Sequence, residues 1–222
     1  MLRLVLSALC VCLLAQTAGA ASLTEALQQK YSAMKSFTAS FEQVLVHKES
    51  GMRESRRGTL DFSKPLLIRW ETKEPSTSKE LLVVSSKDIW NYLPDEAIAY
   101  RMPLVLVQDS RSIIQVITGQ ARLDTDFTVK QQDKEKGLVK LRLYPKEPLP
   151  QMVEATIWVD EANMLIRRAV IVDFYGNTND ITMNDLKPDA PVAASAFSFT
   201  PPKGVEVEDR MDASVQEKAL LN

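Results

Sequence analysis

Residues 58–92 carry the sequence pattern that most constrains the fold of this chain. Leu60 and Phe62 are separated by a single polar residue, and Ile68 and Trp70 repeat this arrangement. Because successive side chains of a β-strand point to opposite faces, the alternation predicts strands with one apolar and one polar face. The stretch therefore predicts a meander of antiparallel strands with a large aromatic-rich face.

The same alternation, interrupted by short polar turns, continues through most of the chain. Lys64-Pro65 fits such a turn, because proline presets one backbone dihedral and cannot donate to a strand ladder. Further strands are expected at residues 36–48, 53–62, 79–84, 97–100, 127–132, 138–144, 153–159, 166–174 and 181–186. The chain is therefore expected to be mainly β.

Two helices are expected beside these strands. A capping box that begins at Ser22 precedes an amphipathic run and predicts a helix packed on the sheet. Residues 102–119 break the strand rhythm and predict a second helix, capped by Asp109 or Ser110 and ended by Gly119.

Residues 1–20 have the form of a secretory signal peptide. Their apolar run is too short to span a bilayer, and Ala18-Gly19-Ala20 is a small-residue cleavage site. A retained membrane anchor is the alternative. Cys10 and Cys12 both lie in this leader, and neither follows the small residue that a lipoprotein signal requires. The mature chain is therefore expected to have no cysteine and no disulfide.

The charge of the mature chain argues against nucleic-acid binding. The leader holds Arg3 and no acidic residue, so 26 basic and 29 acidic residues remain, with a net charge of −3. This balance provides no basic stripe. We expect one domain over residues 21–209, with a polar tail over 210–222.

Residues suited to catalysis or metal binding are scarce. His47 is the only histidine, so a hydrolase triad has no other imidazole base and a tetrahedral zinc site lacks ligands. Asp124-Thr125-Asp126 lacks the glycine and distal glutamate of a calcium loop. Arg56-Arg57 and Arg167-Arg168 are interpreted as solvated strand ends. No catalytic residue, metal or cofactor is expected, and a hydrolase of lipid esters remains the enzymatic alternative.

Five segments of the chain stand in a characteristic order and spacing. These segments are 36–43, Gly58-x-Leu60, Lys64-Pro65 with Ile68-Arg69-Trp70, Leu82-Val83 to Trp90-x-Tyr92, and 197–205. None of them is diagnostic alone, but together they span most of residues 22–209 and resemble the LolA family of periplasmic outer-membrane lipoprotein carriers. The resemblance implies an unclosed antiparallel β-barrel, a strongly curved sheet whose hollow is capped by short helices that act as a lid.

The resemblance also implies a task and partners. A soluble, monomeric protein would receive lipoproteins from an inner-membrane ABC transporter and deliver them to an outer-membrane receptor. The acyl chains would lie in the hollow. Our hypothesis is that the sheet lines it with Phe37, Phe41, Leu60, Phe62, Ile68, Trp70 and Leu82, and the lid with Leu104, Leu106, Ile113 and Ile117.

Lys64 is a departure from the family pattern. The family commonly has an arginine before this proline, which holds the helical lid shut. Lysine lacks the planar guanidinium fork. We expect Lys64 to gate the lid with a different or weaker closure. Carriers of lipids or glycolipids, and sensors of lipoprotein that would need an output domain, are the rival functions.

Overall fold

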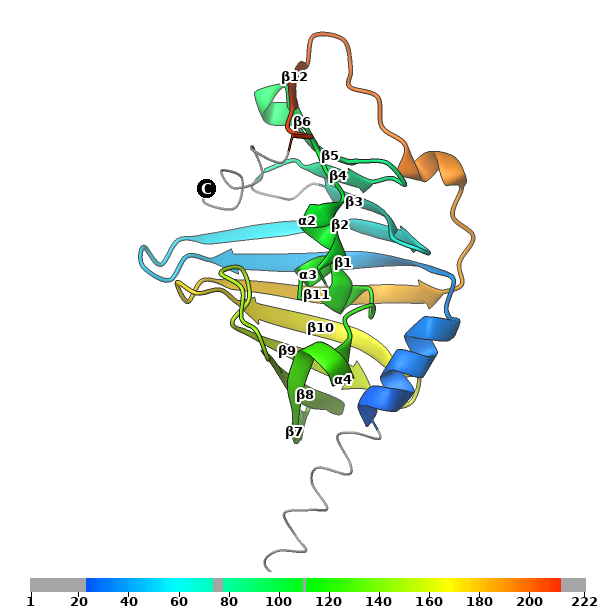
Figure 1. Ribbon diagram of the computed structural model, residues 1–222, viewed down its shortest axis with the longest axis vertical. Helices are drawn as coiled ribbons and strands as arrows, with labels where there is room; N and C mark the ends of the chain where they lie inside the picture. The colour runs from blue at the N-terminus through cyan, green and yellow to red at the C-terminus, as the bar shows by residue number, and fades with distance from the viewer. Residues whose placement is uncertain (1–22, 74–77, 110, 213–222) are drawn as a thin grey trace, which may run out of the picture. The chain divides into compact units, whose positions relative to one another are not determined.

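The computed structural model describes residues 23–73, 78–109 and 111–212, so the predicted leader and the Ser22 cap lie outside the described residues (Figure 1). Strands make up most of the regular structure, as the alternation predicted. They are β1 (Ser36–Val46), β2 (Arg53–Ser63), β3 (Leu67–Lys73), β4 (Leu81–Val84), β5 (Ile89–Leu93), β6 (Ile98–Met102), β7 (Phe127–Glu135), β8 (Leu138–Pro145), β9 (Glu154–Asp160), β10 (Leu165–Val172), β11 (Thr178–Pro188) and β12 (Glu206–Asp209).

The strands form one sheet in the order β12-β6-β5-β4-β3-β2-β1-β11-β10-β9-β8-β7. The two ends of this order are not paired with each other, so the sheet is not closed, which confirms the predicted fold class. Neighbouring strands from β2 to β6 pair antiparallel. β12, which the sequence pattern did not predict, instead pairs parallel to β6.

The helices are short, apart from the one over residues 23–33. They are the 3-10 helices η1 (Pro94–Glu96) and η2 (Ala194–Phe197) and the α-helices α2 (Val105–Gln108), α3 (Ile113–Ile117) and α4 (Leu123–Asp126). Among the described residues, no helix has both the length and the apolar content needed to span a membrane.

The helix predicted to end at Gly119 is confirmed as α3, and the shorter α2 precedes it in the same segment. The cap of α3 is Ser112 and not Asp109; Ser110 lies outside the described residues. Ser112 has extended backbone, and its hydroxyl accepts a hydrogen bond from the Gln115 N–H at 3.3 Å. The predicted end at Gly119 is confirmed by its positive φ of 68°.

The chain divides into two compact units, each with its own buried core. The first comprises Met1–Ala33, Val46–Gly51 and Ser110–Asp180, and the second comprises Met34–Leu45, Met52–Asp109 and Ile181–Asn222. In the first unit the helix over 23–33 buries Leu27 and Tyr31, and the Tyr31 hydroxyl oxygen accepts a hydrogen bond from the Ile166 N–H at 3.0 Å. The candidate functional residues on strands β1 to β4 belong to the second unit.

Candidate functional site

Strand register places the five predicted site residues of β2, β3 and β4 on one face of the sheet. Leu60 lies opposite Trp70, and Phe62 lies opposite Ile68. Trp70 in turn lies opposite Leu82. Directly opposed residues share a face, so these five side chains lie together. The sequence alternation therefore places them correctly relative to one another.

β1 adds two aromatic rings to this surface. The Phe37 and Phe62 ring centroids are 5.1 Å apart, and those of Phe41 and Trp70 are 4.6 Å apart. These tilted pairs have the spacing at which aromatic rings attract each other by about 0.5–1.5 kcal/mol beyond burial. The surface defined by Phe37, Phe41, Leu60, Phe62, Ile68, Trp70 and Leu82 is called the apolar face below.

The apolar face is buried in this structure. Six of its side chains are between 0% and 8% exposed, namely Phe37, Phe41, Leu60, Phe62, Ile68 and Trp70. Leu82 is half-buried. A ligand can therefore reach most of this surface only after the groups that cover it have moved.

Gly58 determines how closely Phe41 approaches β2. A Cβ atom at Gly58 would lie 1.9 Å from the Glu71 carbonyl oxygen and 2.8 Å from Phe41 Cε1. Atoms that are not bonded cannot come so close. Glycine is therefore required where the aromatic ring crosses this strand pair.

The opposite face of β3, β4 and β5 carries a separate aromatic cluster. Trp90 lies opposite Val83, so it is on the other face from Leu82. The Phe199 ring lies 5.6 Å from Trp90 and 5.4 Å from Tyr92. The large aromatic-rich face expected over residues 58–92 therefore includes Phe62 and Trp70 but not Trp90 and Tyr92, because successive strands divide their aromatic residues between two faces.

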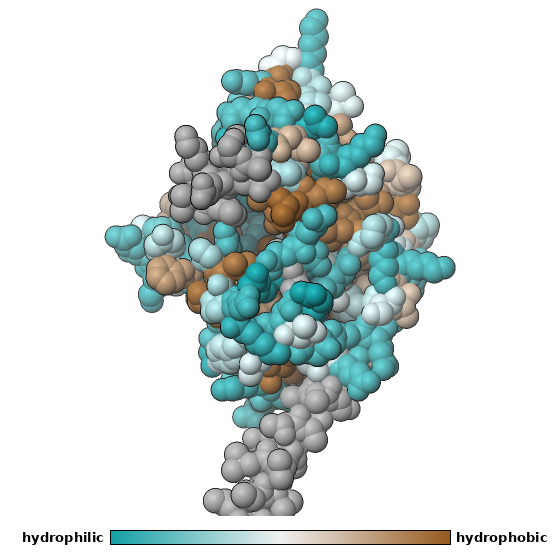
Figure 2. All heavy atoms as spheres, viewed as in Figure 1, coloured by the Kyte–Doolittle hydropathy of each residue, from teal (hydrophilic) through white to brown (hydrophobic). Residues whose placement is uncertain are grey.

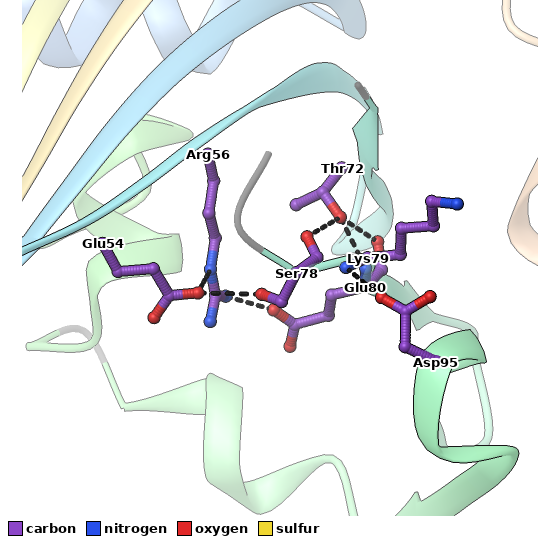
Figure 3. A network of polar contacts seen from close by, with 7 residues as sticks. All are labelled: Glu54, Arg56, Thr72, Ser78, Lys79, Glu80 and Asp95. Atoms are coloured by element: carbon purple, nitrogen blue, oxygen red, sulfur yellow. Dashed lines mark hydrogen bonds and ion pairs between the residues drawn. The ribbon is translucent and has the colours of Figure 1, made fainter. Parts of the chain in front are cut away.

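Charged residues form a polar border on β2, on the same face as Leu60. Arg56 binds the carboxylates of both Glu54 and Glu80, and Glu54 also accepts a hydrogen bond from Ser78 Oγ at 2.8 Å (Figure 3). The Arg56 side chain is 20% exposed. Its interpretation as part of a solvated strand end is wrong, because Arg56 pairs with Glu54 on the same strand and with Glu80, which the fold brings beside it.

Hydrogen bonds in the same polar border connect the start of β4 to β3. The Thr72 N–H donates to the Glu80 carbonyl oxygen at 2.8 Å, and Thr72 Oγ1 donates to that oxygen at 3.0 Å (Figure 3). The Lys79 N–H donates to Asp95 Oδ2 at 3.2 Å. Polar residues thus hold the strand ends beside the apolar face.

The second basic doublet is also paired. Arg168 binds both carboxylate oxygens of Asp180 at 2.8 and 2.7 Å, and its guanidinium lies 4.4 Å from the Trp158 ring centroid. Arg167 binds Asp160 at 3.1 Å. A solvated strand end is therefore wrong for this doublet as well, and both arginines have structural roles in the first unit.

Two of the predicted lid residues lie at α2: Leu104 directly precedes the helix and Leu106 lies within it. Leu104 and Leu106 are half-buried, whereas Val107 is buried and Val105 is 51% exposed. Figure 2 shows apolar side chains at the surface around α2, bordered by hydrophilic ones. This short helix therefore exposes apolar surface within the unit that holds the apolar face.

The other predicted lid residues belong to α3 in the first unit. Ile117 is fully buried, and Ile113 is half-buried. Beside α3, a crevice lined by residues such as Leu27, Val116 and Ile157 has a volume of about 10 Å³. That volume holds about one water molecule, so this crevice does not accommodate an acyl chain.

Lys64 is half-buried in the turn between β2 and β3. Its peptide bond to Pro65 is cis, and its N–H donates to the Lys35 carbonyl oxygen at 2.9 Å. The Lys35 N–H donates to Asp189 Oδ1 at 2.8 Å. The backbone of this turn is therefore held by the segment that precedes β1, within the same unit.

Two carboxylates of the second unit, Asp61 and Asp88, have shifted pKa values. Burial raises the pKa of Asp61, although Arg69 nearby acts in the opposite direction. Burial also raises the pKa of Asp88, but hydrogen bonds from Ser85 and Arg101 outweigh it and hold that pKa below its usual value. The Asp88 carboxylate accepts these bonds at 2.6 and 2.8 Å.

The polar groups considered for catalysis or metal binding are dispersed. His47 is exposed, and its Nδ1 lies 2.9 Å from Ser50 Oγ. Asp124 accepts a hydrogen bond from Gln28, and Asp126 pairs with Arg122. Within the described ranges, no three His, Cys, Asp or Glu side chains are grouped to hold a metal ion. The chemistry that the apolar face supports is noncovalent binding of apolar groups.

Comparisons with known proteins assign this fold a family. The model of the family described as "Outer membrane lipoprotein carrier protein LolA" matches residues 32–200. An outer-membrane lipoprotein carrier protein of Bordetella pertussis is 30% identical over 196 residues, which are 88% of this chain and 90% of the relative. A carrier of the same name from Pseudoalteromonas translucida is 28% identical and covers 84% of this chain and 87% of its own.

A solved structure supports the fold. An uncharacterized conserved protein from Thermus thermophilus superposes with a TM-score of 0.55 at 15% identity. The match covers 84% of this chain and 98% of that protein. At this identity the likeness concerns the fold alone.

Proposed function

Because the chain belongs to the LolA family of outer membrane lipoprotein carrier proteins, we propose that it binds lipoprotein acyl chains on its apolar face. The observation that carries this proposal is the continuity of the face. Its residues come from four strands, β1 to β4, and meet in register on one side of the sheet. Such a surface offers an acyl chain many apolar contacts and no reactive group.

The energetics favour a noncovalent carrier. Burial of each CH₂ group contributes about 0.8 kcal/mol, so a sixteen-carbon chain gains on the order of 12 kcal/mol before costs. A carrier must keep most of the acyl chain out of water and must still be able to release it. A buried apolar face that becomes accessible by movement of its cover meets both requirements, and the protein then acts as a chaperone and not as an enzyme.

The cover is part of the proposal. Leu104 at the start of α2, Leu106 within α2, and Ile113 and Ile117 of α3 are proposed to contact the acyl chain once the cover has moved. The exposed Val105 and the half-buried leucines of α2 support this role, because they provide apolar surface on a short element. Lys64 is proposed to control opening without binding the lipid.

We place this cycle in the periplasm. The leader at residues 1–20 and the carrier names of the relatives support that location. The protein would act as a monomer that accepts lipoproteins from an inner-membrane ABC transporter. It would then pass them to an outer-membrane receptor.

Site-specific photo-crosslinking tests the proposal. A benzophenone amino acid is introduced at Ile68 on the apolar face, and cells are irradiated. We expect a covalent adduct with lipoprotein, detected by its increased mass. Arg69 is the matched control, because it is the next residue on β3 and lies on the opposite face.

Two outcomes would contradict the proposal. No adduct at Ile68, or equal adducts at Ile68 and Arg69, would remove the apolar face as the binding surface. Mass spectrometry of the compounds that co-purify after depletion of the outer-membrane receptor addresses the rival functions. Free lipid or glycolipid in place of lipoprotein would identify a carrier of those compounds.

A further inference from the structure

One row of residues crosses the sheet from β2 to β6 beside the apolar face. In register order it consists of Leu60, Trp70, Leu82, Asn91 and Tyr100. Directly opposed residues share a face, so Asn91 is on the side that carries Trp70 and Leu82. A primary amide thus follows three apolar residues on the proposed acyl-binding side.

The amide oxygen of Asn91 lacks a hydrogen-bond donor. It is buried, and no group within the described part of the chain donates to it. Buried polar atoms are nearly always paired, because an unpaired acceptor loses its hydration without compensation. An apolar residue such as leucine would avoid this cost at the same place in the row.

We propose that Asn91 Oδ1 accepts a hydrogen bond from an amide N–H of the bound lipoprotein, next to its acyl chains. This inference rests on the proposed carrier function and adds a specificity-determining residue to it. An acceptor can pair only with a donor. Amide groups of an acylated polypeptide supply N–H donors beside the acyl chain, whereas ester-linked lipid carbonyls only accept hydrogen bonds.

This hydrogen bond would let the protein discriminate between acylated polypeptides and ester-linked lipids at the end of the row, where Asn91 lies. The acyl chain gains free energy equally from the apolar residues whatever its linkage. Only an acyl chain that is linked through an amide, or that lies next to the peptide groups of a polypeptide, also offers an N–H donor to Asn91 Oδ1. The carrier would thereby favour acylated polypeptide over lipids whose chains end in esters, which matters in a compartment bounded by phospholipid membranes.

Three probes of equal chain length test this inference. They are N-methylhexadecanamide, which has an N–H donor, and N,N-dimethylhexadecanamide and methyl hexadecanoate, which have none. Binding to the full chain is measured by displacement of a fluorescent fatty acid. We expect the wild-type protein to bind the N–H probe about fivefold more tightly than the other two, as one additional neutral hydrogen bond would give.

Two Asn91 variants and one control identify the residue responsible. Asn91→Leu should remove the preference and leave the affinity for the ester within about twofold. Asn91→Ala removes the acceptor without adding volume and should lose the same preference. Leu82→Ala, the neighbouring change in the row, should weaken binding of all three probes alike, because it removes apolar contact only.

The outcomes separate this inference from the function on which it rests. The proposed hydrogen bond would be contradicted if all three probes bound the wild-type protein equally, or if both Asn91 variants kept the preference for the N–H probe. Either result would leave the carrier function standing. Failure of every probe to bind would overturn both. A water molecule that already satisfies Asn91 in the complex would give the first of these results.

Discussion

At the scale of single residues, Gly58 and Asp88 show how close contacts shape the second unit. Gly58 allows the Phe41 ring to approach β2 because it has no Cβ atom. Asp88 is buried but receives hydrogen bonds from Ser85 and Arg101. The first residue determines packing on the apolar face, and the second is a buried charge at the turn between β4 and β5 that these hydrogen bonds compensate.

Gly58→Ala is expected to lower the free energy of unfolding by about 1–3 kcal/mol, as overpacking of a well-packed site typically does. The added Cβ would lie 1.9 Å from the Glu71 carbonyl oxygen, so the two strands must separate. Urea denaturation measures the effect. Thr59→Ala, the next position on β2 and on the opposite face, is the control and should change stability little. Equal midpoints for the two variants would contradict the steric argument.

Asp88→Asn is expected to destabilise the protein in a pH-dependent manner. The pKa of Asp88 lies below its usual value in the folded state, so its charge stabilises the fold above the unfolded pKa of about 3.9. This contribution is lost as pH falls through the folded pKa. The unfolding midpoint of the variant should therefore lie below that of the wild type at pH 7. The difference between the two unfolding midpoints should be smaller at pH 3. An equal difference at both pH values would show that ionisation of Asp88 is not responsible.

At the scale of elements, the break between α2 and α3 distinguishes two short helices with different surroundings. Val105 of α2 is exposed, whereas Ile114, Val116 and Ile117 of α3 are buried. α3 is stabilised at its start by Ser112 and is followed by Gly119, where a Cβ would lie 2.1 Å from the Tyr31 ring. The position of α3 in the first unit thus depends on a cap at one end and a close approach at the other.

Ser112→Ala is expected to lower the free energy of unfolding by about 1 kcal/mol, the usual cost of losing an N-cap. The Gln115 N–H would lose the hydroxyl that now accepts its hydrogen bond. Ser112→Asp keeps an acceptor and should retain most of the stability. Thermal denaturation of the three proteins provides the measurement, and identical melting temperatures for Ser112→Ala and wild type would argue against a capping role.

At the scale of the whole molecule, the proposed binding residues come from both compact units. The sheet residues, Leu104 and Leu106 belong to the second unit, and Ile113 and Ile117 belong to the first. Lys64 is in the second unit, in a turn whose backbone is bound to the segment before β1. The proposed binding and release of cargo must therefore be tested on the full protein.

Lys64→Leu is expected to leave acyl loading unchanged and to impair onward transfer. The proposed role of Lys64 is control of the cover, and the apolar face itself is unaltered in this variant. Crosslinking through Ile68 reports loading, and appearance of lipoprotein on the outer-membrane receptor reports transfer. Lys64→Arg, which introduces the residue common in the family, should transfer normally. Normal transfer by Lys64→Leu would remove the gating role.

Much of the second unit was predictable because its strands have a local signature. The alternation in residues 58–71 identified β2, β3 and the relative orientation of Leu60, Phe62, Ile68 and Trp70. Because one face of each strand is buried, apolar residues recur at every second position of the sequence. The pattern could not reveal that Trp90 lies on the opposite face, because that depends on the register of β4 and β5.

The polar contacts were the least predictable part. Arg56 pairs with Glu80 across 24 positions, and Arg168 pairs with Asp180 across 12, so neither partner follows from the doublets themselves. The unpaired oxygen of Asn91 was likewise invisible in the sequence. Nothing in the composition of Ile89-Trp90-Asn91-Tyr92 shows which of these side chains lie beside Leu82.

The sequence by itself determined the mainly β class, most strand positions and the family, because alternation and segment order are properties of neighbouring residues. Only the tertiary structure decided which strands pair, which face each aromatic residue occupies and which charges meet. Those features arise from contacts between residues far apart in the chain. The free energy of such contacts depends on register and distance, which a linear pattern does not contain.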